Sequence, residues 1–137
     1  MFPQQILLNE TRITTAVAAQ TGGVIGELYS LKALVVGAKF VYGSGGNAVK
    51  AWVQTSLDNQ LNWIDIICFS FSNESLRKVA CVNSITSVTT VYTPSDGTLG
   101  GDSVKDGILG DALRVKYTTI GTYADDTTLT INMALKG

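Results

Sequence analysis

The sequence lacks histidine and is poor in cysteine and proline. Its 137 residues include no His, two Cys and two Pro. Without His, the commonest general base, the Ser-His-Asp triad and histidine metal ligands are all excluded. Two cysteines without a His partner make poor nucleophiles. We therefore predict that the chain is not an enzyme, with no catalytic residue, no cofactor and no metal.

Clusters of basic residues and long apolar runs are also missing. The net charge is −1, and the basic residues are scattered along the chain. A nucleic-acid partner requires a concentrated basic patch, so we expect none. The longest apolar runs are of strand length, well short of the roughly 18 residues of a membrane span, so we expect no membrane partner. The first five residues do not resemble a secretory leader, which predicts a soluble protein made in the cytoplasm.

What the sequence does contain is alternation of apolar and polar residues, which is typical of strands. Residues 31–42 and 111–119 show it most clearly, and Thr is abundant throughout. Gly-rich or Pro-containing turns are predicted at 20–23, 43–47 and 93–97. Short helical alternatives remain open at 74–80 and 104–109. The predicted strands cover 31–42, 48–56, 63–71, 76–82, 85–92, 111–119 and 128–135.

About eight short strands with turn signals every 8–12 residues or so are typical of a sandwich or barrel. We predict an all-β fold: a single domain over residues 1–137, built as a two-sheet β-sandwich, with an eight-stranded jelly roll as the leading topology. An immunoglobulin-like sandwich is the alternative, although Trp52 and Trp63 both precede Cys68. Residues 1–12 are interpreted as an extended N-terminal arm or an edge strand. Cys68 and Cys81 are expected to be free thiols.

Three motifs invite a binding function, and each is better explained by turns. Residues 43–50 (GSGGNAVK) lack the Gly-Lys-Ser/Thr ending of a phosphate loop. Residues 56–63 (SLDNQLNW) partly match an Asp box, in which the Asp accepts turn N–H groups; sugar binding is the alternative. The Asp-rich stretch 96–111 lacks the spacing and closing Glu of a calcium loop. Trp52 and Trp63 are expected to be core or interface residues.

Several segments resemble small proteins of tailed phages and prophages. The segments are KFVYGSGG (39–46), VKAWVQTSLD (49–58), WIDI (63–66), DGILGDALRVKYTT (106–119) and GTY (121–123). The likeness covers residues 35–135. It includes the small jelly-roll cement, or minor capsid, proteins that decorate the outside of phage capsids. That family carries no catalytic residues.

The resemblance implies a structural virion protein on the capsid exterior, made in the cytoplasm of the bacterial host. Its partners would be the phage major capsid protein and further copies of itself, as a homo-dimer or homo-trimer. The low charge, 15% of residues, also indicates a surface partly covered by partners. A tail, baseplate or fibre-associated sandwich and a carbohydrate-binding module for host attachment are the alternatives. Candidate partner contacts are Phe2, Ile6, Leu7, Leu8 and Arg12 in the arm, and the loop 93–110.

Overall fold

The computed structural model describes residues 5–14, 16–85 and 87–137, and these residues form strands and loops with no helix. Eight strands are long and three have two residues each. Their bounds are β1 Gln5–Arg12, β2 Val17–Ile25, β3 Ala33–Val41, β4 Ser44–Gly45, β5 Ala48–Ser56, β6 Ile64–Phe71, β7 Leu76–Asn83, β8 Ser103–Val104, β9 Ala112–Ile120, β10 Tyr123–Ala124 and β11 Thr128–Lys136.

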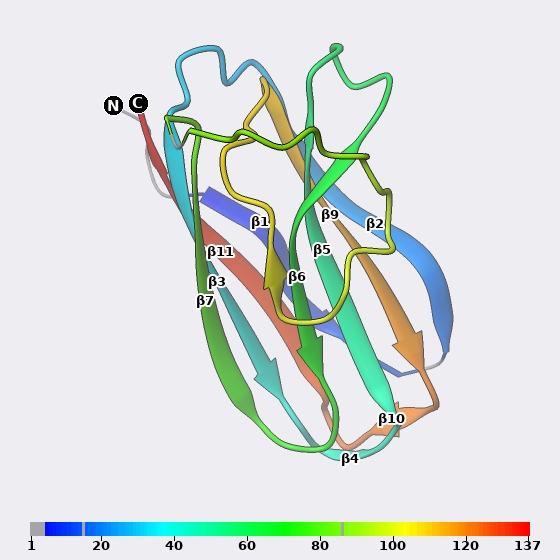
Figure 1. Ribbon diagram of the computed structural model, residues 1–137. Helices are drawn as coiled ribbons and strands as arrows, with labels where there is room; N and C mark the ends of the chain where they lie inside the picture. Colours follow the sequence, from blue (N-terminus) through cyan, green and yellow to red (C-terminus); the bar gives the residue numbers. More distant parts are fainter. Residues whose placement is uncertain (1–4, 15, 86) are drawn as a thin grey trace.

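The strands form two antiparallel sheets that pack face to face as a β-sandwich (Figure 1). One sheet has four strands in the order β1-β11-β3-β7, and the other has five in the order β2-β9-β5-β6-β8. The short pair β10-β4 forms a separate ribbon at one end of the sandwich. The prediction of an all-β, two-sheet sandwich is confirmed.

The core lies between the sheets and follows the alternation of the sequence. In β3 the inward residues Leu34, Val36, Ala38 and Phe40 are all at most 2% exposed. They pair across the sheet with the inward residues of β11, from Leu34 opposite Leu135 to Phe40 opposite Leu129. Each such strand has one face in the core and one outside, which is the arrangement that a period of two predicts.

Strand β5 departs from simple alternation because it is covered on both faces. Residues 51–56 are all buried, including the polar side chains of Gln54, Thr55 and Ser56. Val49, Ala51 and Val53 face the core. The other face lies under the long connection from β7 to β9, residues 84–111, which crosses the outside of the five-stranded sheet (Figure 1).

Two local predictions are wrong. Residues 85 and 87–92 form no strand, because this segment runs from β7 towards the other sheet and joins neither ladder. Residues 20–23 form no turn; they lie within β2, where the pairing with β9 shifts between Thr21 and Val24. Glycine inside a strand thus marks a bulge here. The helical alternatives at 74–80 and 104–109 are not formed, and the predicted strand 76–82 is confirmed as β7.

The proposed arm is also corrected for the residues that the structure describes. Residues 5–12 are β1, an edge strand that pairs with β11 of the same chain. Backbone groups of β1 are therefore used inside the domain. The edge-strand alternative is the one that the structure supports, and residues 1–4 lie outside the described residues.

Candidate docking surface

No metal-binding cluster is found in the described parts of the chain. No group of three His, Cys, Asp or Glu residues there is arranged to hold a metal ion. The same residues contain no helix that is long and apolar enough to cross a bilayer.

Asp65 fixes the long connection against the five-stranded sheet. Its side chain is fully buried in β6, yet it accepts hydrogen bonds from several donors. The backbone N–H groups of Gly97, Thr98 and Leu99 donate to it over 2.8–3.1 Å. The side chains of Ser95 and Gln54 donate to it as well, each over 2.8 Å. The turn at 95–99 is thus wrapped around one carboxyl group.

Asp96 adds a second, more exposed anchor for the same turn. Its carboxylate accepts hydrogen bonds from Gln54 and Lys116, at 2.6 and 2.7 Å. Burial opposes its ionisation. The hydrogen bonds from Lys116 and Gln54 and the charges of Lys116 and Arg114 outweigh burial, so the pKa of Asp96 is lowered from its ordinary value.

Both tryptophans are engaged within the chain. Trp52 is 5% exposed, and its indole N–H donates to the carbonyl of Leu99 over 2.9 Å. Trp63 is half-buried, and the Arg114 guanidinium lies over its ring at 4.4 Å from the ring centre. The prediction that these rings are core or interface residues is consistent with these contacts. The hydrogen bond from Trp52 to Leu99 also holds the long connection against the sheet.

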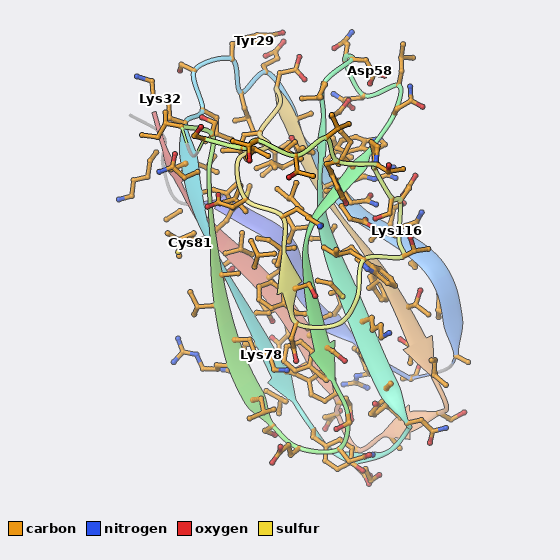
Figure 2. The ribbon with its side chains drawn as sticks, in the orientation of Figure 1. Tyr29, Lys32, Asp58, Lys78, Cys81 and Lys116 are labelled. Carbon is orange, nitrogen blue, oxygen red and sulfur yellow. The ribbon has the colours of Figure 1, made fainter. Side chains whose placement is uncertain are left out.

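Large, exposed apolar side chains lie on the loops at one end of the sandwich, opposite the β4-β10 ribbon. We call this surface the loop end; Figure 2 shows two of its loops, labelled at Tyr29 and Asp58. Its six large apolar side chains are 53–95% exposed, and Val91 is the most exposed. They are Tyr29, Leu57, Leu61, Ile85, Val88 and Val91.

The loops of the loop end are held together by backbone contacts. Ser84 N–H donates to the Lys32 carbonyl over 2.7 Å, which ties the start of the long connection to the β2–β3 loop. Asp65 N–H donates to the Ser95 carbonyl over 2.8 Å, beside the β5–β6 hairpin. The apolar side chains are therefore presented by anchored loops.

The degenerate Asp box shapes the hairpin that carries Leu57 and Leu61. The Asp58 carboxylate accepts hydrogen bonds from the Asn62 backbone and side chain, at 2.8 and 2.6 Å. These bonds are the main cause of a lowered pKa of Asp58. Asn59 and Gln60 adopt positive φ values of 57° and 69°. The prediction of a structured turn is confirmed.

The predicted contact residues lie elsewhere. Phe2 falls outside the described residues, and Ile6, Leu7 and Leu8 lie in β1, at the edge of the four-stranded sheet. Arg12 forms an exposed salt bridge of 2.8 Å with Asp126, near the opposite end from the loop end. The structure does not bring Arg12 together with the loop end.

The cysteines match the sequence prediction. Both are free thiols: Cys68 is buried in β6, whereas Cys81 is exposed on β7. Burial raises the pKa of Cys68 to about 11. Its thiol is therefore protonated and shielded at neutral pH.

Sequence reasoning missed Asp65 and most of the loop end. A carboxyl residue inside the apolar run 64–71 is itself a signal, because an ionisable group in a buried strand needs partners. The sequence predicts a strand over 85–92, in which alternate side chains would be buried, whereas Val88 and Val91 are 53% and 95% exposed.

Comparison with known proteins adds no relative: no protein-family model matches the chain, and no curated protein matches its sequence.

Proposed function

We propose that this protein is a structural component of a tailed-phage particle, bound to the outside of the assembled capsid as a decoration, or cement, protein. The loop end is the observation that supports this most. A domain that exposes six large apolar side chains on anchored loops is suited to a protein partner. The proposed partner is the phage major capsid protein. A protein that binds only the assembled shell stabilises that shell by mass action.

We infer further that the sandwich is a jelly roll. When the eight long strands are numbered in chain order, the sheets become 1-8-3-6 and 2-7-4-5. The pairs 1-8, 2-7, 3-6 and 4-5 are the partners of one long antiparallel hairpin rolled into two sheets, which is how a jelly roll is built. The resemblance to jelly-roll cement proteins predicts the same topology.

A carbohydrate-binding module has less support. Sugar recognition of the kind that the Asp-box likeness implied needs an open aromatic face. Trp52 is buried and bonded to Leu99, and one face of Trp63 is covered by Arg114. A tail or baseplate position would use the same kind of surface but a different copy number.

The experiment is a binding assay with capsids that lack this protein. Purified chain is added, bound copies are counted by quantitative mass spectrometry, and cryo-EM locates them. Hundreds of bound copies on the shell exterior and a raised disruption temperature are expected for a decoration protein. Copies found only on tails would overturn the proposal.

A matched pair of variants tests the loop end. The double variant Leu61→Asp and Val91→Asp places charges at two side chains that are 80% and 95% exposed. We expect it to fold normally and to lose capsid occupancy at least 10-fold. The control is Ile120→Asp, a 50% exposed side chain at the opposite end, with unchanged occupancy expected. Equal loss in both would exclude the loop end as the contact.

A further inference from the structure

Strand β7 differs from every other edge of the two sheets. The pairing of β1 with β11 and of β2 with β9 shifts register twice each, and β8 has only two residues. By contrast β7 pairs with β3 from Phe40–Leu76 to Ala33–Asn83 without a shift. On its other side it has no strand partner within the described ranges. A long regular edge of this kind is a template for strand addition.

Two contacts assign the direction of the backbone groups of β7. Ser84 N–H donates to the Lys32 carbonyl, towards β3, over 2.7 Å. Asn83 N–H donates instead to the Asp106 carboxyl group, on the open side, over 2.7 Å. Because successive residues of a strand alternate in direction, Arg77, Val79 and Cys81 direct their N–H and C=O groups outward. The open ladder thus runs from residue 77 to 81 and ends where Asp106 caps Asn83.

Lys78 does not obstruct this edge. An inward-pointing charge on an edge strand commonly protects it from pairing, because a partner would desolvate that charge. The Lys78 ammonium already donates to the Ser70 carbonyl and to the Asp102 carboxylate, which it contacts at 2.9 Å. Figure 2 labels Lys78 and Cys81 on β7. Its charge is satisfied within its own chain, between the edges of the two sheets.

We propose that β7 pairs antiparallel with β7 of a second copy, about a two-fold axis that passes through Val79. A two-fold axis perpendicular to the sheet keeps the outer faces of both sheets on the same side. Val79 then lies opposite the partner's Val79, and Arg77 lies opposite the partner's Cys81. Each of these hydrogen-bonded pairs exchanges two backbone bonds. The two four-stranded sheets become one continuous sheet.

Charge complementarity supports this register. Arg77 is exposed and forms no salt bridge within the described part of the chain. In the dimer it lies two residues along the strand from the partner's Asn83, beside which the partner's Asp106 carboxyl group is held. That offset, roughly 7 Å, is within reach of an arginine side chain. The symmetry creates the same ion pair twice, once at each end of the ladder.

The neighbouring register is disfavoured by the same contacts. An axis through Ala80 would place Arg77 opposite the partner's Asn83, whose N–H is already bonded to Asp106. The Val79 register instead uses only backbone groups that are open. It also covers the Val79 side chain, which is 67% exposed in the single chain.

The first test measures the mass of the intact protein in solution by light scattering and analytical ultracentrifugation. Wild type is expected at twice the chain mass. Val79→Pro removes an outward N–H that β3 does not use, and proline is tolerated at such edge positions, so a folded monomer is expected. Val79→Thr keeps the N–H and should remain dimeric. A wild-type monomer, a trimer, or a dimeric Val79→Pro variant would overturn the proposal.

The second test determines the register in which the two β7 strands pair, and it does not depend on the proline variant. Across the axis the two residues at position 79 have Cα atoms about 5.5 Å apart, within disulfide range. The two Cys81 residues are offset by four positions, about 14 Å, and cannot bridge. Val79→Cys combined with Cys81→Ser should form a covalent dimer under mild oxidation, whereas wild type should not. The reverse result would overturn the register. The outcome is independent of capsid binding, which uses the loop end.

Discussion

At the scale of single residues, Asp65 holds the long connection over the outer face of the five-stranded sheet. Its carboxyl group lies 32–34 positions before the backbone donors that it holds, Gly97, Thr98 and Leu99. No local pattern in the sequence reveals such a contact. The sequence shows an acidic residue within an apolar strand. Its hydrogen-bond partners, however, depend on the path of the long connection over the sheet, which the sequence does not reveal.

Replacement of Asp65 by Asn is therefore expected to be costly. The amide keeps the shape but presents an NH₂ group to donors, so buried N–H groups lose their acceptor. We expect the free energy of unfolding to fall by about 2–4 kcal/mol, measured by urea denaturation. Proteolysis within residues 84–102 should also become faster.

Ser95→Ala is the control for this prediction. It removes one donor to Asp65 and leaves the backbone donors in place. A loss of about 1 kcal/mol is expected. An Asp65→Asn variant as stable as wild type would show that the carboxyl group is not what holds the connection.

At the scale of strands and turns, the alternation of apolar and polar residues predicts the strands that pair in a sheet. It fails for a segment that has the composition of a strand but pairs with no neighbouring strand. The predicted bounds of β5 match the structure at both ends, because its glycine-rich and polar flanks end the alternation. Residues 85–92 have the β-branched composition of a strand, yet residues 85 and 87–92 cross the loop end without pairing. Strand propensity describes how well residues fit a sheet, but it does not show whether a neighbouring strand is available for pairing.

The turn after β4 contains a glycine, Gly46, whose replacement by alanine is expected to be destabilising. Gly46 has a φ of +68°, and an added Cβ would lie 2.2 Å from the Tyr123 ring. That ring cannot yield easily, because it is 1% exposed and its hydroxyl donates to the Ser72 carbonyl. Gly46→Ala should lower stability by about 2–4 kcal/mol, measured by urea denaturation.

Gly37 is the matched control within a strand. It lies in β3, its φ is not in the left-handed region, and an added Cβ meets nothing within 4 Å. Gly37→Ala should be neutral or stabilise by up to about 1 kcal/mol, because the unfolded chain loses freedom. If both variants were equally destabilised, local crowding at Tyr123 would not be the cause.

At the scale of the molecule, the charged groups set a simple dependence of stability on pH. The chain has no His, so no side chain has an ordinary pKa between about 5 and 8. Asp58, Asp96 and Asp102 have pKa values lowered from 3.8. At Asp102 burial acts against ionisation, but hydrogen bonds from Lys78 and Ser70 outweigh it.

A lowered pKa in the folded state means that these carboxylates stabilise the fold above their unfolded pKa, near 4. That stabilisation is lost as the pH falls through the lower folded values. We expect a melting temperature that is flat from about pH 5 to 7.5 and falls below about pH 4. Asp96→Asn should have a smaller loss in acid than wild type. A melting temperature that changes steeply near pH 6.5 would contradict the assignment.

The pairing of β1 with β11 has a consequence for synthesis on the ribosome. Gln5 pairs with Met133 and Arg12 with Thr128, so the edge of the four-stranded sheet closes only when nearly the entire chain has emerged. At a translation rate of about 5–20 residues per second, roughly 6–25 s pass between the synthesis of the apolar segment 6–8 and that of its partner strand. During that interval this apolar segment has no partner strand, and the speed of translation sets the length of the interval.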